Sequence, residues 1–539
     1  MKASDLLVDQ LVKNWVKVVY WVPGEENLDL IESIRESEEI DLILTRNEQT
    51  AVFMAATYGR LTENPWVAIS TLGPWATNLV TWVTYAQLGG FPVVVITWQK
   101  PIKKSKQGLF QIINVVSMME PITKFATKVV SGYRLAHILN NAFRLSKSER
   151  PGASCIELPE DIARESVDVD TSLISHQKVR RPAIDEKCLN NLIKELEKAK
   201  HPIILIWAWA NRKKITKYLT YFIQKHNIPF FTSQMWKGVV DESLSQCLGT
   251  AALSSGDYIH DAISQSDLIL SVWYDPVEKP TYLIGSWGVK TIHINFFESR
   301  IDPVYSPYLD IVGDIGNTFW QLCESNIDTT KQDFERIYST KEKYQEQITR
   351  NIEEEDMGDN IMGPRKLVND TRNFLEKEDI LALDNWLYKV WFARNYICYK
   401  PNTLILDNAL ATMGAGVASG MEAKRLNPNK NVVVITGDGW FMMNVGDLET
   451  AVRQDLDLII VVLNDWSYWM IKWKQQVTSM PVWWMDFGNP DYVKLAESFG
   501  WVWFRVENKN NFFETLKNAQ KQKWLKIIDL KFKYPEEIN

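Results

Sequence analysis

The sequence has 539 residues, enough for three or four domains of ordinary size. Its formal net charge of −7 argues against a general nucleic-acid-binding protein, which would have a basic face for the phosphate backbone. No apolar run reaches the roughly 18 residues needed to cross a bilayer, and no secretion signal opens the chain. The five cysteines form no CxxC pair, so we expect a cytoplasmic protein that binds neither nucleic acid nor membrane.

Short apolar runs alternate with amphipathic helical stretches along most of the chain. Residues 1–165 contain KVVYWVP, DLILT, WVAIST and FPVVVIT. After a polar linker at 166–185, residues 186–325 contain HPIILIWAWA, NIPFFTS, SDLILSVWY, KTIHINF and LDIVGD. A charged, mostly helical stretch at 326–362 precedes 363–535, with ILALDN, NVVVITGDG, LDLIIVVLND and WLKIIDLKF. This alternation predicts three successive α/β domains with parallel sheets, at 1–165, 186–325 and 363–535, which bind ligands beyond the carboxyl ends of their strands.

Acidic and amide side chains follow two predicted strands of the third domain. Gly437, Asp438 and Gly439 come after NVVVIT, and Asn464 and Asp465 come after LIIVVL. Glycines let the backbone approach a diphosphate, and carboxylates at a strand end can hold a hard cation. Each motif alone is typical of a tight turn. Together, and each after an apolar strand, they favour an oxygen-rich site for Mg²⁺ bridging a diphosphate.

The same region resembles the cofactor-anchoring segment of thiamine diphosphate enzymes, in which GDG is followed on the next strand by an N-N or N-D pair. Residues 437–475 are similar to the acetolactate synthase branch of that family. The resemblance implies Mg²⁺ ligands at Asp438, at Asp465 and at the main-chain carbonyl of Ser467. Aspartate at the second ligand position, where asparagine is commoner in the family, is similar to the catabolic acetolactate synthases.

A second resemblance lies in the first domain. TRNEQTAVFMAATYGRLT at 45–62 resembles R-H-E-Q-x-A-x-x-M-A-x-G-Y-x-R, with Glu48 at the position of the catalytic glutamate. A carboxylate hydrogen-bonded to N1′ of the aminopyrimidine favours the imino tautomer, which then deprotonates the thiazolium. A lone glutamate on a helix is ordinarily a surface residue, so the surrounding string carries the assignment. The family has histidine where this chain has Asn47.

Four shorter strings also resemble segments that line the family's site. They imply cofactor contacts for Pro23, Gly24 and Asn78, and a Gln111 side chain that faces the substrate. The strings are VPGEEN at 22–27, STLGPWATNLVTWV at 70–83, QGLFQII at 107–113 and ATMGAG at 411–416.

Two methionines complete the implied contacts. Met413 is the implied apolar buttress that holds the cofactor bent, although an ordinary core methionine is an equally good interpretation. Met470 is a further implied cofactor contact. The family's G-x-H string contacts the diphosphate. It corresponds here to residues 386–388, WLY, so this set of diphosphate contacts has no assigned residue.

The resemblance implies a carboligase that depends on thiamine diphosphate and Mg²⁺. Pyruvate loses CO₂, and its hydroxyethyl unit condenses with a second 2-keto acid, as in branched-chain amino acid biosynthesis. WYDPVEKP at 273–280 stands where the FAD-containing members carry R-F-D-D-R, so we expect no FAD. Glu48 and the metal ligands lie in different domains, and the resemblance implies that each site forms between two subunits of a homodimer or homotetramer.

Two other functions stay open. A 2-keto acid decarboxylase, a pyruvate oxidase or an acyltransferase of the same family shares every cofactor motif and differs only in what accepts the two-carbon unit. A non-catalytic relative is the other alternative, but Glu48, Asp438 and Asp465 together favour an enzyme. A dinucleotide-binding protein is disfavoured because no G-x-G-x-x-G follows the first strands.

Tryptophan stands at many positions where the family pattern has glycine. The chain has 23 tryptophans but only 25 glycines, below the usual glycine share of about 7%. An indole does not fit where the backbone needs a positive φ or a close approach, so we expect overpacking and an obstructed cofactor cleft. We hypothesise that the source organism reads UGA as glycine, whereas the sequence as written translates UGA as tryptophan. The alternative is a deliberately substituted chain. The positions are Trp21, Trp75, Trp82, Trp98, Trp207, Trp209, Trp236, Trp273, Trp386, Trp440 and Trp469.

Mass spectrometry of the protein from its natural source tests this hypothesis. We expect the peptides that cover residues 66–82 to carry glycine in place of Trp75 and Trp82. Peptides from this region with the mass of an indole side chain at each position would show that the tryptophans are native.

Overall fold

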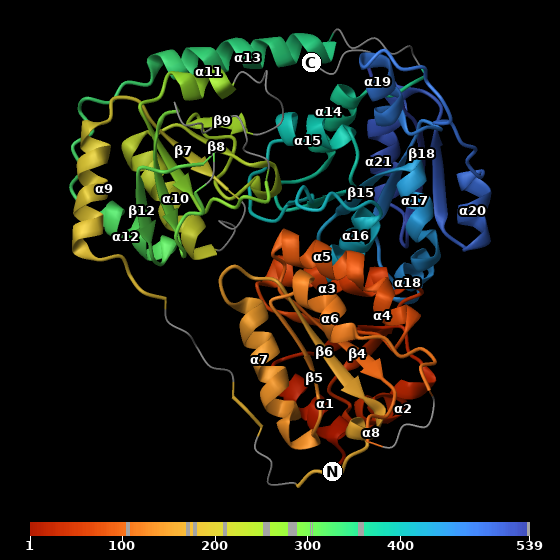
Figure 1. Ribbon diagram of the computed structural model, residues 1–539. Coiled ribbons are helices and arrows are strands. Elements are labelled where there is room, and N and C mark those ends of the chain that lie inside the picture. The colour runs from red at the N-terminus through yellow and green to blue at the C-terminus, as the bar shows by residue number, and fades with distance from the viewer. Residues whose placement is uncertain are drawn as a thin grey trace. The chain divides into compact units, whose positions relative to one another are not determined.

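The computed structural model describes residues 1–103, 108–168, 173–175, 181–207, 213–251, 259–278, 288–301, 303, 305–353 and 360–535 (Figure 1). These residues form three six-stranded sheets, and every strand pairing in them is parallel. Helices connect most consecutive strands. The prediction of three successive parallel-sheet α/β domains is thus confirmed. Within the described ranges, no helix combines the length and the apolar character that crossing a membrane requires.

The first sheet has the strand order β2-β1-β3-β4-β6-β5. On one face, alternate strand residues such as Val19, Val67 and Ile156 share a core with helices α1 and α7, while α3 and α5 cover the other face (Figure 1). The strands are β1 Val18–Trp21, β2 Asp41–Leu44, β3 Trp66–Ile69, β4 Val93–Gln99, β5 Phe125–Lys128 and β6 Ala153–Pro159. The helices are α1 Ala3–Lys13, α2 Leu28–Ser37, α3 Glu48–Thr62, α4 Pro74–Asn78, α5 Val80–Gly89, α6 Val115–Met119, α7 Leu135–Lys147 and α8 Glu160–Ala163.

The second sheet has the order β12-β11-β10-β7-β8-β9. Its central strands are buried along their whole length, as is typical of a parallel sheet with helices on both faces. The strands are β7 Pro202–Ile206, β8 Phe230–Thr232, β9 Cys247–Thr250, β10 Leu268–Val272, β11 Lys290–Asn295 and β12 Leu309–Val312. The helices are α9 Glu186–Lys198, α10 Lys213–His226, α11 Ile259–Ser264 and α12 Ile315–Glu324, and the charged stretch that follows contains α13, Glu335–Glu353.

The third sheet has the order β14-β13-β15-β16-β18-β17. The chain leaves β13 to form the edge strand β14 and returns to the other side of β13 as β15, so the order reverses at this point. Ligands of such sheets bind where the order reverses, beyond the carboxyl ends of the strands. The strands are β13 Ile380–Leu383, β14 Leu404–Ile405, β15 Val432–Gly437, β16 Ile459–Asn464, β17 Val502–Val506 and β18 Lys526–Lys531. The helices are α14 Pro364–Phe374, α15 Tyr388–Asn395, α16 Ala415–Leu426, α17 Asp438–Asn444, α18 Leu448–Arg453, α19 Trp469–Val477, α20 Tyr492–Ser498 and α21 Phe512–Gln520.

The chain divides into two compact units that do not follow its order. The first comprises 1–179, 409–429 and 441–458, and the second comprises 180–408, 430–440 and 459–539. Helix α16 therefore belongs to the first unit, where it packs along α3. Within each unit, buried hydrogen bonds join the separate segments of the chain. In the first unit, for example, the hydroxyl of Tyr20 donates to Glu422 at 2.5 Å.

Five of the tryptophans in the described ranges have a left-handed backbone. The φ angle is +61° at Trp15 and Trp273, +54° at Trp466, +57° at Trp484 and +82° at Trp524. For a bulky residue a positive φ is a genuine outlier, whereas glycine adopts it without a steric cost. Trp273 is among the positions predicted to be glycine, and the other four extend that set. Trp209 lies outside the described residues.

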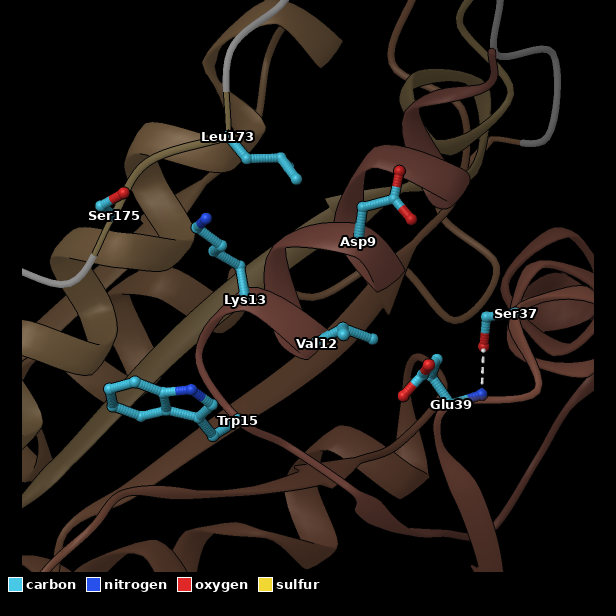
Figure 2. A pocket seen from close by; sticks show the side chains of 8 residues that line it. All are labelled: Asp9, Val12, Lys13, Trp15, Ser37, Glu39, Leu173 and Ser175. Atoms are coloured by element: carbon cyan, nitrogen blue, oxygen red, sulfur yellow. Dashed lines mark hydrogen bonds between the residues drawn. The ribbon is translucent and has the colours of Figure 1, made fainter.

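Trp15 shows why glycine suits such a position. It follows the C-cap of α1, and its N–H donates to the carbonyl of Val12 at 2.9 Å. The next N–H, that of Val16, donates to the carbonyl of Leu11 at 3.1 Å. These two bonds form a Schellman motif, whose left-handed residue is usually glycine. The indole is 67% exposed, and Figure 2 shows it beside a cavity of about 740 Å³ that Asp9 also lines.

Other tryptophans bury an unsatisfied donor. Trp21 in β1 and Trp98 in β4 are completely buried, and neither indole N–H has a hydrogen-bond partner among the described residues. A buried donor without a partner costs about 1–3 kcal/mol. The backbone strain and these donors both support the hypothesis that glycine is the native residue at such positions.

Replacing Trp15 with glycine should therefore stabilise the protein. Removing the left-handed strain of a residue with a Cβ is worth about 1 kcal/mol. The matched control is Trp320→Gly, because Trp320 is also partly exposed but lies within α12, where glycine should destabilise by about 1 kcal/mol. Urea unfolding of both variants measures the two shifts. An equal loss of stability in both would contradict the role assigned to the left-handed backbone.

Candidate functional site

The structure brings the two predicted metal-ligand carboxylates together. Strands β15 and β16 are neighbours, with Gly437 opposite Leu463, so their carboxyl ends lie side by side. Asp438 begins α17, and its Oδ2 accepts hydrogen bonds from the N–H groups of Asp465, at 3.3 Å, and Trp466, at 2.8 Å. Both carboxylates therefore lie at the edge of the sheet where the sequence predicts them.

Burial and mutual repulsion outweigh the interactions that favour the ionised forms of these two carboxylates. Burial raises the pKa of Asp438, and burial together with the charge of Asp438 raises the pKa of Asp465 to about 8. The buried Oδ2 of Asp465 has no hydrogen-bond partner among the described residues. Two close carboxylates disfavour each other's ionised form, and a cation between them removes that penalty. The pair thus fits a hard divalent cation such as Mg²⁺.

Two carboxylates alone do not complete a coordination shell. In the described part of the chain, no group of three or more His, Cys, Asp and Glu side chains is placed to hold a metal ion. A cation at this pair would need further oxygen ligands, such as main-chain carbonyls, side-chain amides, water or a diphosphate. Ser467 is buried beside the pair, and its N–H donates to Oδ1 of Asp465 at 3.4 Å. That the main-chain carbonyl of Ser467 is a metal ligand stays a prediction.

Asn489, which the sequence analysis missed, fixes both strand ends. Its Nδ2 donates to Oδ2 of Asp438 at 2.6 Å and to Oδ1 of Asn464 at 2.9 Å. Asn464 in turn donates to Asp529 at 3.1 Å. Asn489 lies outside any regular element, just before α20, so neither strand spacing nor helix periodicity indicates it. The string GNPD at 488–491 was the available signal, since such residues are typical of structured turns.

The two glycines of the GDG motif differ in the space around them. A Cβ built on Gly437 would meet no atom within 4 Å, whereas one on Gly439 would lie 3.4 Å from the ring of Phe487. The Trp386 and Trp440 rings pack edge to face at 4.4 Å between centroids, and Tyr468 lies 5.4 Å from Trp440. The two indoles thus occupy volume next to the GDG backbone, where the sequence predicts a diphosphate. Met470, in α19, is partly buried.

Glu48 lies in the first unit as the first residue of α3. Its side chain is buried, and Oε2 accepts a hydrogen bond from Nδ2 of Asn78 at 3.0 Å. The structure therefore brings together two residues that the sequence assigns to the cofactor site. Asn47, the departure from the family's histidine, caps the helix, because its side chain accepts from the N–H of Gln49 at 3.0 Å.

Asp447, also missed by the sequence analysis, anchors the start of α3. Its carboxylate accepts from the N–H of Arg46 at 2.7 Å and from the hydroxyl of Thr50 at 2.6 Å. Burial raises the pKa of Asp447. These contacts span about 400 positions along the chain, so no local pattern could have indicated them.

The other predicted contacts of the first unit lie on loops after strands. Gly24 follows β1, and a Cβ there would lie 2.9 Å from Cγ2 of Thr71, so the loops pack closely. Pro23 is exposed beside it. Gln111 has φ +57° and packs against Gly73, whose own Cβ would lie 3.0 Å from that of Gln111.

Met413 is not an ordinary core methionine. Its side chain is 40% exposed, just before α16, which leaves the apolar side chain free to contact a ligand or another chain. The predicted residues thus form two groups, each within one unit. Glu48, Asn78 and Met413 belong to the first unit, whereas Asp438 and Asp465 belong to the second.

Comparison with known proteins gives one family for the whole chain. Three family models match: thiamine pyrophosphate enzyme, N-terminal TPP binding domain, at 1–118; the central domain of the same enzymes at 189–322; and their C-terminal TPP binding domain at 387–530. Thiamine pyrophosphate is the same compound as thiamine diphosphate. The three matches follow the order of the three sheets.

Curated relatives agree with these matches. The chain is 28% identical to "Acetolactate synthase" of Bacillus subtilis (strain 168), over 100% of this chain and 94% of the relative. It is 27% identical to "Acetolactate synthase, catabolic" of Raoultella terrigena, over 96% and 92%. It is 28% identical to "Probable acetolactate synthase large subunit" of Methanococcus aeolicus, over 96% and 90%. The chain therefore belongs to the thiamine pyrophosphate enzymes, in their acetolactate synthase branch of carbon–carbon bond-forming enzymes.

Proposed function

We propose that this carboligase uses Mg²⁺ and thiamine diphosphate to decarboxylate pyruvate and to join the two-carbon unit to a second 2-keto acid. The observation that carries the proposal is the pair of carboxylates at adjacent strand ends, Asp438 and Asp465, in which one buried oxygen lacks a partner. Such a pair suits a metal that bridges to a diphosphate. The reaction would serve branched-chain amino acid biosynthesis in the cytoplasm.

The second unit supplies the residues for the cofactor's diphosphate end. Asp438, Asp465 and the carbonyl of Ser467 would hold Mg²⁺, and Asn489 keeps the first of these carboxylates in place. The open space beside Gly437 lets a phosphate group approach the backbone. When bound, the cofactor supplies the electron sink that makes decarboxylation of a 2-keto acid possible.

The first unit supplies the residues for the pyrimidine end. The carboxyl group of Glu48 would share a proton with a ring nitrogen, and Asn78 orients that carboxyl group through its hydrogen bond. Pro23 and Gly24 would lie against the pyrimidine ring, and Met413 would be the apolar contact that holds the cofactor bent. Gln111 would face the 2-keto acid.

We also propose that two copies of the chain complete each site, in a homodimer or homotetramer. Each unit carries only one group of the predicted residues. Large apolar side chains are exposed on both units, and Leu109 and Trp484 are more than 80% exposed. Exposed apolar groups of this size are typical of interfaces between chains. Others are Phe110, Met413, Met480 and Trp483.

Product analysis with pyruvate tests the proposed reaction. The protein from its natural source, supplied with thiamine diphosphate and Mg²⁺, should form 2-acetolactate and CO₂. Glu48→Gln should lower the rate by about 100-fold or more, because it removes a proton-transfer group. The control is Glu36→Gln, at an exposed position of α2. Acetaldehyde, acetyl phosphate or H₂O₂ as the main product would instead assign the chain to a decarboxylase, an acyltransferase or an oxidase.

Removing the crowding indoles should improve cofactor binding. The double variant Trp386→Gly, Trp440→Gly should bind thiamine diphosphate with Mg²⁺ about tenfold more tightly, because more of the GDG backbone is then open to the diphosphate. Trp503→Gly is the matched control, since Trp503 lies on the edge strand β17. Calorimetric titration measures the affinities. Weaker binding by the double variant would mean that the indoles contribute to the site.

A further inference from the structure

A buried ion pair lies in the first unit, where the carboxyl ends of neighbouring strands meet. Nζ of Lys100 lies 2.9 Å from Oε1 of Glu26, and each side chain is only 8% exposed. Lys100 directly follows β4, and Glu26 lies in the single helical turn after β1. The other carboxylate oxygen of Glu26 accepts a hydrogen bond at 3.0 Å from the hydroxyl of Thr71, which follows β3. The pair therefore joins the loops of three adjacent strands.

Stability alone does not explain such a pair. The cost of removing two charges from water is often as large as their mutual attraction, and apolar side chains of similar volume often serve a fold equally well. A hydrogen-bonded ion pair differs from an apolar contact in another respect, because it accepts only a narrow range of distances and directions. The Glu26–Lys100 pair is thus suited to fix the relative positions of the loops that it joins.

Further buried hydrogen bonds lead from Lys100 toward Gln111. The N–H of Lys100 donates to Oε1 of Gln99 at 3.0 Å. Nε2 of Gln99 donates to the carbonyl of Ile113 at 3.1 Å and to Oε1 of Glu157 at 2.8 Å. The side chains of Gln99 and Glu157 are buried. Because Ile113 is two residues beyond Gln111, these bonds hold one end of the turn that carries Gln111.

The loop after β3 reaches the same turn at a second point. Gly73, two residues after Thr71, packs against Gln111, since a Cβ built on Gly73 would lie 3.0 Å from the Cβ of Gln111. The hydrogen bond between Thr71 and Glu26 fixes this loop to the ion pair. Both members of the pair are therefore connected to the turn, by different segments of the chain.

The backbone of Gln111 needs this support. Its φ of +57° is left-handed, which costs energy for a residue with a Cβ. Residues strained in this way persist where their surroundings hold them, and they cluster at functional sites. Leu109 and Phe110, which precede Gln111, are exposed on the first unit and pack little against it. Buried hydrogen bonds from the neighbouring segments can supply the support instead.

We propose that Glu26 and Lys100 are positioning residues, which set the side chain of Gln111 against the 2-keto acid. This rests on the proposed function, in which Gln111 faces that substrate. The pair fixes the loops after β1, β3 and β4 relative to one another, and the turn that carries Gln111 follows their position. Since Glu26 lies two residues after Gly24, the pair also relates this turn to the loop proposed to contact the pyrimidine ring.

Steady-state kinetics of the full-length protein with pyruvate tests the proposal. The double variant Glu26→Gln, Lys100→Gln removes both charges, so that neither stays buried without its partner. It should raise KM for pyruvate about tenfold, because a displaced contact binds the substrate less well. The matched control is Lys103→Gln, Glu165→Gln, which removes an ion pair of the same composition at a more exposed place and should leave KM unchanged. Thermal unfolding checks that both double variants remain folded.

Coupling to Gln111 distinguishes positioning from a general loss of structure. In a Gln111→Ala background, the Glu26→Gln, Lys100→Gln substitutions should raise KM no further, because the side chain that they displace is already absent. An equal rise of KM in both backgrounds would overturn the proposal. An unchanged KM in the presence of Gln111 would overturn it as well.

Hydrogen exchange tests the position of the turn without any turnover. Backbone amides of residues 22–27 and 109–113 should exchange about tenfold faster in the Glu26→Gln, Lys100→Gln variant, whereas those of α7 should not change. Unchanged exchange at 109–113 would contradict the positioning role even in a protein that forms 2-acetolactate. Faster exchange there, in a protein that makes no product from pyruvate, would support the positioning of the turn and reject the proposed function.

Discussion

The unfavourable proximity of Asp438 and Asp465 is the constraint on which the proposed site depends. Parallel pairing of β15 and β16 forces the two strand ends together, where burial and the charge of Asp438 raise the pKa of Asp465 despite the nearby cation of Lys472. Such an arrangement destabilises the protein when both groups are ionised, unless a metal is bound. The metal in turn needs further oxygen ligands, which a diphosphate can supply. Strand order, carboxylate pair and cofactor class are therefore linked by one electrostatic requirement.

The same reasoning explains why the sequence indicated this half of the site well. Asp438 and Asp465 follow buried strands directly, and the carboxyl ends of neighbouring parallel strands must meet. Glu48 could be predicted for another reason, since its assignment came from a string that resembles a known family. Three sheets could be predicted because short, wholly apolar runs mark their central strands. Short strands such as β14, Leu404–Ile405, have too few residues to show a pattern.

Residues that act through distant contacts could not be predicted. Asn489 bridges Asp438 and Asn464, and Asp447 holds the start of α3, but neither lies in a periodic segment next to its partners. Their roles follow from the folded chain, which brings loops to strand ends. The grouping of α16 with the first unit is a similar case, because only the folded contacts with α3 reveal it.

The tryptophans connect local backbone geometry with the function of the site. At Trp466 the chain turns with φ +54° directly after Asp465, and the N–H of Trp466 donates to Asp438. That turn therefore places the second carboxylate against the first. Glycine adopts the turn without strain, whereas an indole there carries a steric cost beside the proposed metal site. If the native residue is glycine, the geometry that pairs the carboxylates is the relaxed one. A bound metal would then have to offset only the repulsion between the two charges.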